Sequence, residues 1–140
     1  MLQDFSSSRE AAICSHFVQG AGWQAVTAGA AAEALERLRE DPAIGVLFLD
    51  IRLPDRDGID LLRELKRTHA TLEIVMITAH ASIDLAVDAM KSGATDFVTK
   101  PFTRSRVVAA LERVDRIRGL QEEVSRLRSA LEEQLVFEGI

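Results

Sequence analysis

The sequence predicts a doubly wound α/β domain, in which helices cover both faces of a parallel sheet, followed by one long helix. Short apolar runs bounded by turn or cap residues alternate along the chain with segments of helical periodicity. The runs are apolar on both faces, which is typical of parallel strands, and parallel strands need a crossover between them. The alternation therefore indicates helices packed on both sides of a sheet.

The elements follow one another in a regular order. Strands are expected at three apolar runs and, less clearly, at a fourth: Ile44–Leu49, Glu73–Ile77, Thr95–Thr99 and Trp23–Ala28. Helices are expected between them, at Ala30–Glu40, Gly58–Thr68 and Ile83–Ser92. In such a sheet, ligands bind beyond the C-terminal ends of the strands. The residues directly after the three clear runs are therefore the candidate site: Asp50, Thr78 and Lys100.

One long helix is predicted after Phe102, because no proline interrupts the pattern. Beyond a first part that faces the sheet, its apolar residues repeat every seven positions. One seam position holds Ile117, Val124 and Leu131, and the other holds Leu120 and Leu127. This pattern favours a parallel two-stranded coiled coil, with a solvated helical tail as the alternative. We assign 1–116 to the domain and 117–140 to a coiled-coil linker, with a hinge expected at Gly119.

Composition excludes several classes of function. The chain of 140 residues has 17 basic and 22 acidic residues, a formal net charge of −5, and 5% aromatic residues. Direct contact with nucleic acid is therefore not expected, whether through phosphates or through stacked bases. The single cysteine cannot form an internal disulfide, and no apolar stretch is long enough to cross a bilayer. We expect a cytoplasmic protein without an export signal or a membrane partner.

The candidate site combines a carboxylate, a hydroxyl and an ammonium group. A carboxylate such as Asp50 can attack a phosphoryl group and form an acyl phosphate. Lys100 would then offset the phosphoryl charge, and the Thr78 hydroxyl would donate a hydrogen bond to a phosphoryl oxygen. Taken singly, such an Asp is more often a turn former or helix cap, and such a Lys a solvated charge. The rigid Lys100-Pro101 step and the shared position at strand ends favour phosphoryl chemistry.

Four ordered motifs resemble the receiver domain of two-component response regulators. They are Leu49–Gly58, Met76–Ala79, Gly93–Phe97 and Lys100–Phe102, and the resemblance covers about residues 9 to 115. It implies a flavodoxin-like fold of five strands and five helices, with the first strand truncated here. It also implies a role for each matching residue: Asp50 as phosphoacceptor, Thr78 as switch hydroxyl, Lys100 as phosphate-binding lysine, Phe97 as switch aromatic, and Arg52 and His80 as residues that tune autodephosphorylation. Phe97 also fits a plain core position.

In that family, two adjacent acids after the first strand bind Mg²⁺ together with the phosphoacceptor. Here Asp4 matches the second acid and Gln3 stands at the first, whereas counting back from Gly22 reaches Phe5–Ser7 and leaves no acid. Mg²⁺ prefers hard oxygen ligands. The candidate ligands of a weakened site are Asp4, Asp50 and the backbone carbonyl of Arg52. The nearby loop acids, interpreted as turn residues, are Asp55 and Asp57.

The resemblance implies a regulatory module and not an enzyme, with slow autodephosphorylation at most. A histidine kinase would phosphorylate Asp50, and the new charge would attract Thr78 and change the surface around Ile83–Phe97. The alternative is a pseudo-receiver, an interaction module that takes no phosphate because its acidic Mg²⁺ site is degraded. A phosphatase of the haloacid-dehalogenase type needs a second Asp two residues after the nucleophile, and Arg52 occupies that position.

The long helix is similar to the dimerising linker of σ54-dependent, NtrC-type transcription activators. That similarity implies a homodimer formed through the C-terminal helix. It also implies AAA+ ATPase and DNA-binding domains in the full-length protein, and Leu135–Ile140 resembles the approach to such an ATPase. The chain is therefore expected to be a fragment of a longer regulator.

Overall fold

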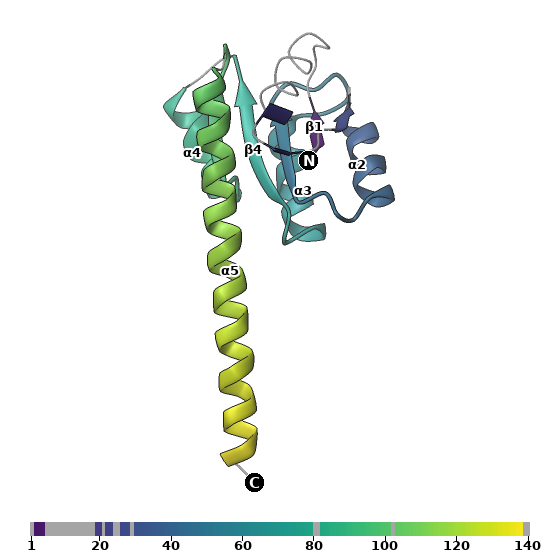
Figure 1. The fold of residues 1–140 in the computed structure, drawn as a ribbon. Helices are drawn as coiled ribbons and strands as arrows, with labels where there is room; N and C mark the ends of the chain where they lie inside the picture. The colour runs from purple at the N-terminus through teal and green to yellow at the C-terminus, as the bar shows by residue number, and fades with distance from the viewer. Residues whose placement is uncertain are drawn as a thin grey trace.

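The computed structural model of the chain shows a layered domain from which one long helix projects (Figure 1). The structure describes residues 2–4, 19–20, 22–23, 26–28, 30–79, 82–101 and 103–138. Of these, residues 2–4, 26–27 and 134–138 are described by their backbone alone. Within the described ranges, no helix combines the length and the apolar character needed to cross a bilayer.

A five-stranded parallel sheet lies at the centre of the domain. Its strands are β1 (Leu2–Asp4), β2 (Val26–Ala28), β3 (Val46–Asp50), β4 (Glu73–Thr78) and β5 (Asp96–Thr99). Their order in the sheet is β2-β1-β3-β4-β5, the order of a flavodoxin-like fold, so the predicted fold class is confirmed. The first strand is three residues long, yet it pairs in parallel with both β2 and β3.

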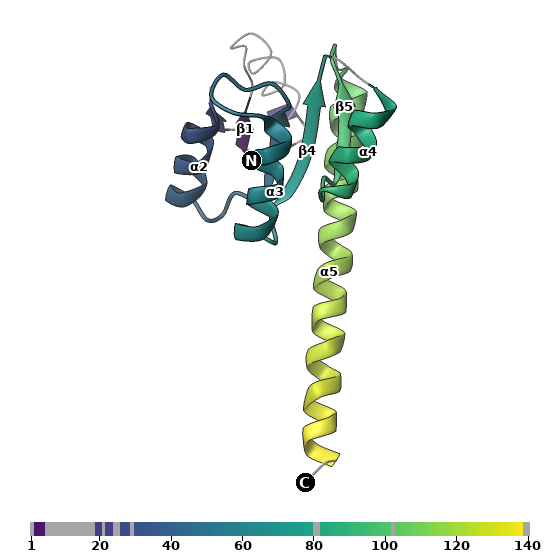
Figure 2. The same ribbon diagram turned by 180° about the vertical axis from the view of Figure 1, so that it is seen from behind.

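Four helices are described around this sheet: α2 (Ala31–Glu40), α3 (Gly58–Thr68), α4 (Ile83–Lys91) and α5 (Arg104–Glu138). Three of them, α2, α3 and α4, cover one face, whereas α5 covers the other (Figures 1 and 2). Alternate side chains of β3 and β4 explain this division. Leu47 and Ile74 pack in the cluster under α2, α3 and α4, and Phe48 and Val75 pack in the cluster under α5. Strands apolar on both faces are thus buried on both faces.

Two helices begin at side chains that accept a hydrogen bond from a free backbone amide. Asp57 caps α3 by accepting from the amide of Ile59 at 2.7 Å. Ser82 caps α4 by accepting from the amide of Leu85 at 3.1 Å. The first turn of a helix leaves such amides without helical partners, and these caps satisfy them.

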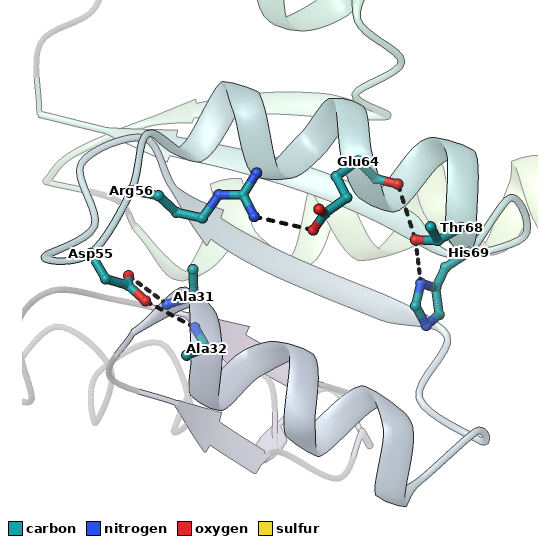
Figure 3. A network of polar contacts seen from close by, with 7 residues as sticks. All are labelled: Ala31, Ala32, Asp55, Arg56, Glu64, Thr68 and His69. Carbon is teal, nitrogen blue, oxygen red and sulfur yellow. Dashed lines mark hydrogen bonds and ion pairs between the residues drawn. The ribbon is translucent and has the colours of Figure 1, made fainter.

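The start of α2 is capped from a distant loop. Its own N-cap residue is Ala30, which offers no side-chain acceptor. Asp55, in the loop between β3 and α3, instead accepts hydrogen bonds from the amides of Ala31 and Ala32 at 2.9 and 3.0 Å (Figure 3). These two amides lower the pKa of Asp55 below its ordinary value. The acid interpreted as a turn residue therefore also joins the loop after β3 to α2.

The long helix α5 is continuous from Arg104 to Glu138 and passes through Gly119, where a hinge was expected. Its first turns pack on the sheet through Val107, Leu111 and Val114. The remainder extends well past the domain (Figure 2). Domain and projecting segment therefore share one uninterrupted helix.

Candidate functional site

The three predicted residues lie at the C-terminal ends of three neighbouring strands. Asp50 ends β3 and Thr78 ends β4, and both are buried, with 3% and 2% of their surface exposed. Lys100 directly follows β5, and its backbone amide donates to the carbonyl oxygen of Thr78 at 2.7 Å. Because β3, β4 and β5 are adjacent in the sheet, the fold brings these residues to one edge of the domain.

The Asp50 carboxylate is in direct contact with the Lys100 ammonium. Lys100 Nζ donates to Asp50 Oδ2 at 2.6 Å, while Oδ1 accepts from the backbone amide of Arg52 at 3.0 Å. Only 4% of the Asp50 side chain and 10% of the Lys100 side chain are exposed. An ion pair so well enclosed is screened little by solvent, so removing either charge leaves the other at a high cost.

The loop after Asp50 turns back closely against the end of β3. The Gly58 amide donates to the carbonyl oxygen of Ile51 at 2.7 Å. A Cβ atom on Gly58 would lie 2.3 Å from the carbonyl oxygen of Asp50, far inside any real contact. Glycine is therefore required at the start of α3, directly beside the backbone of the carboxylate residue.

The lysine is held by its own local backbone. The peptide bond between Lys100 and Pro101 is cis. The Lys100 amide also continues the ladder beyond the last pair of β4 and β5, in which Thr78 lies opposite Thr99. The backbone of Lys100 is therefore tied to the end of β4 by a hydrogen bond.

The other predicted site residues have different surroundings. Arg52 is exposed and forms a single antiparallel bridge with Asp57. Phe97 is half-buried in β5 and packs against the cluster under α2, α3 and α4, so it contributes to that core. His80 lies outside the described residues.

Asp4 is described by its backbone alone. It is the last residue of β1, and its Cα is in register with Leu49 of β3 and Ala28 of β2. This register places Asp4 at a strand end, one position before the level of Asp50.

The oxygen donors at this edge are of the kind that Mg²⁺ takes. Among the described residues, no group of three His, Cys, Asp or Glu side chains is arranged to hold a metal ion. The Asp50 carboxylate and the Arg52 carbonyl are both hard oxygen donors, and Mg²⁺ in proteins often uses one or two carboxylates with phosphate and water. The residues present therefore fit a Mg²⁺ site with few protein ligands.

An ion pair beside Phe97 was missed by the sequence analysis. Arg106, in the first turn of α5, donates to both carboxylate oxygens of Asp96 at 2.8 and 3.0 Å and to the carbonyl oxygen of Phe97 at 2.9 Å. Burial alone would raise the pKa of Asp96, but the Arg106 guanidinium and the Phe97 amide outweigh it and lower that pKa. The pair ties α5 to β5.

Neutralising Asp96 is expected to destabilise the domain in a pH-dependent manner. Because its pKa in the folded protein is below the ordinary 3.8, the carboxylate stabilises the fold above pH 3.8, and this contribution is lost as the pH falls through the lowered pKa. Asp96→Asn should therefore lower the melting temperature at neutral pH, with a difference from wild type that shrinks below pH 3.8. Asp115→Asn, at an exposed position of α5, is the control; a pH-independent deficit in Asp96→Asn would contradict the prediction.

Comparison with known proteins gives consistent matches. The family model described as "Response regulator receiver domain" matches residues 7–112. The DNA-binding transcriptional regulator NtrC of Escherichia coli (strain K12) is 42% identical over 113 residues, covering 81% of this chain and 24% of that protein. The transcriptional regulatory protein FixJ of Rhizobium meliloti (strain 1021) is 42% identical over 82 residues, covering 59% of this chain and 40% of that protein. The chain thus spans less than half the length of these relatives.

Solved structures match the fold as well. NtrX from Brucella abortus superposes with a TM-score of 0.84 and 35% identity, covering 91% of this chain and 29% of that one. The separate receiver domain of NtrX from the same organism gives a TM-score of 0.76 with 34% identity, covering 81% of this chain and 95% of that one.

Proposed function

The chain belongs to the family of response-regulator receiver domains, and on that premise we propose that Asp50 takes a phosphoryl group from a histidine kinase. The observation that carries this proposal is the contact of 2.6 Å between Lys100 Nζ and Asp50 Oδ2. It sets a fixed cation beside a carboxylate at the strand ends, where ligands of this sheet architecture bind. Receiver domains are regulatory phosphoacceptors, so a regulatory role and not metabolic catalysis follows.

The transfer is a nucleophilic displacement at phosphorus. A carboxylate oxygen of Asp50 attacks the phosphorus of a phosphohistidine; the P–O bond forms as the P–N bond breaks, and the electron pair leaves with the imidazole. Lys100 offsets the charge of the transferred group, and the Thr78 hydroxyl donates a hydrogen bond to one of its oxygens. Bound Mg²⁺ would neutralise phosphoryl charge, held by Asp50, the Arg52 carbonyl and Asp4.

The conformational change then passes from the site to β5 and from there to α5. Phosphorylation adds about 1.5 to 2 negative charges near neutral pH, and these attract Lys100 and Thr78. Phe97 lies in β5, beside the strand that ends at Thr78, and its carbonyl oxygen accepts a hydrogen bond from Arg106 of α5. A change at Phe97 therefore reaches the long helix through a direct contact.

The remaining parts of the proposal concern the whole protein. The receiver ends near residue 116, and the segment 117–140 pairs with a second copy of this chain. AAA+ ATPase and DNA-binding domains follow in the full-length regulator, which works in the cytoplasm beside its kinase. Arg52 and His80 tune the rate at which the acyl phosphate is hydrolysed.

The proposal is tested by chemical phosphorylation. With acetyl phosphate and Mg²⁺, intact-mass spectrometry should show the chain gaining one phosphoryl group, and beryllofluoride should bind. Asp50→Asn should gain none, whereas Asp60→Asn, a change in an exposed acid of α3, should be phosphorylated like wild type. If the wild-type chain gains no mass while a control receiver responds, Asp50 is not a phosphoacceptor.

A pseudo-receiver is the second candidate, and one observation favours it. Only 4% of the Asp50 side chain is exposed, which restricts the approach of a phosphodonor. Calorimetric titration with Mg²⁺ separates the two functions, because a phosphoacceptor should bind the ion at millimolar concentration. Absence of Mg²⁺ binding together with absence of phosphorylation would favour an interaction module.

A further inference from the structure

The outer part of α5 carries an apolar stripe that the domain leaves uncovered. Its members are 47 to 62% exposed: Leu120, Val124, Leu127 and Leu131. An apolar stripe of this kind is unfavourable in water and is typical of a surface that another helix covers.

The stripe points away from the domain of its own chain. The residues of α5 that face the sheet include Val107, Leu111 and Val114. At about 100° per residue, they lie roughly a third of a turn around the helix from the stripe. The helix also extends past the domain in both views (Figures 1 and 2). The described part of the chain therefore leaves room for a second helix along the stripe.

On the proposed function, this stripe is the seam between two copies of the chain; we infer further that Glu123 and Arg128 fix their orientation and register. With the stripe at heptad positions a and d, Glu123 occupies position g and Arg128 the next position e. In a parallel, in-register pair, each g residue faces the e residue five positions further along the other helix. Glu123 thus meets Arg128 of the second copy.

The two side chains are suited to this contact. Both residues are exposed. Glu123 forms an ion pair with Arg126, which occupies the outer position c of the same helix. Arg126 itself lies outside the seam, so positions e and g are left to the contact between the two copies. Twofold symmetry makes every contact occur twice, so one acid and one base provide two pairs between the helices.

The other arrangements of two helices lose these pairs. Sliding one parallel helix by a heptad places Glu123 opposite Gln121 or Leu135. Reversing one helix brings g opposite g and e opposite e, so that Glu123 faces Ala130, another Glu123 or Arg116, which lies at the domain end of the helix. Only the parallel, in-register pair sets Glu123 against Arg128, which makes these charges a selector of orientation as well as of partner.

Charge reversal in the full 140-residue chain tests this inference. Glu123→Arg and Arg128→Glu each turn two attractive pairs into two repulsive ones, so each variant should dimerise about tenfold more weakly in sedimentation equilibrium at low salt. Mixing the two variants should form a heterodimer, and the double variant should regain wild-type affinity. High salt should reduce all these differences. Glu133→Arg, the same reversal at the outer position c, is the matched control and should change little.

Cross-linking tests the orientation independently. With Cys14, the one cysteine of the sequence, replaced by serine, Leu120→Cys places a thiol near one end of the seam. In a parallel pair the two thiols are adjacent and a mild oxidant should join the chains, whereas in an antiparallel pair they lie at opposite ends.

The outcomes separate this inference from the proposals on which it rests. A dimer whose affinity is unchanged by both single reversals, or whose variants do not recover on mixing, would overturn the role of Glu123 and Arg128 while leaving the dimer in place. A wild-type chain that stays monomeric at high micromolar concentration would overturn the dimer and the inference together. Phosphorylation of Asp50 is measured separately by mass in either case.

Discussion

Replacing Gly58 with alanine is expected to lower the free energy of unfolding by about 3 kcal/mol. The new Cβ would lie 2.3 Å from the Asp50 carbonyl oxygen and 2.7 Å from the Ile51 Cα. Both are backbone atoms, so neither can rotate out of the way. Relief of the clash must move the end of β3 or the start of α3 and weaken the bond of 2.7 Å between the Gly58 amide and the Ile51 carbonyl. Urea unfolding followed by circular dichroism measures the loss.

Gly119 provides a matched comparison for that substitution. It lies inside α5, and a Cβ added there meets nothing within 4 Å. Gly119→Ala should therefore stabilise the helix by up to about 1 kcal/mol, because alanine has the higher helix propensity. Equal effects of the two alanine substitutions would contradict the close contact at Gly58.

Replacing Lys100 with methionine is expected to cost about 3 kcal/mol of folding free energy at neutral pH. The change removes the ammonium that lies 2.6 Å from a carboxylate with only 4% of its side chain exposed. Methionine preserves most of the volume of the lysine chain, so the loss reports on charge more than on packing. Lys91→Met, at an exposed position in the last turn of α4, should stay within about 0.5 kcal/mol of wild type.

A double-mutant cycle isolates the contact itself. Combining Lys100→Met with Asp50→Asn removes both charges, so the double variant should be more stable than the sum of the two single losses predicts. A coupling free energy of about 2 kcal/mol is expected from a cycle measured by chemical denaturation. Additive losses would show that the two groups do not stabilise each other.

Much of the fold could be predicted because burial on two faces leaves a clear sequence pattern. The helix Gly58–Thr68 was predicted to the residue, since its apolar stripe begins directly after the capping residue Asp57. Strand ends were less accurate: β3 begins at Val46, two residues later than expected. A strand begins at its first paired residue, and the first pair of β3 and β4 is Val46 with Glu73. The carbonyl oxygen of Gly45, one residue earlier, accepts a hydrogen bond from the Glu73 amide. The presence of the first strand could not be predicted from composition, because it has only three residues. Three residues are enough to form a strand here because both β2 and β3 pair with them.

The site was predictable to the extent that it follows strand ends. Asp50, Thr78 and Lys100 come directly after apolar runs, and the parallel sheet brings their ends together. Contacts made by packing left no local signal. Asp55 reaches amides 23 and 24 positions away, and Arg106 reaches Asp96 across the junction between β5 and α5. Such partners depend on where loops and helices meet in space.

Because α5 is continuous, it can act as a rigid lever. At about 1.5 Å per residue, α5 runs on for about 35 Å from Val114, its last residue packed on the sheet, to Glu138, and Arg106 ties its first turn to β5. The displacement of a rigid helix grows with the distance from the turns packed on the sheet. A tilt of about 5° at those turns therefore moves the far end of α5 by about 3 Å. A small tilt of the anchored turns is thereby enlarged to a shift about the length of a hydrogen bond at the far end of the helix.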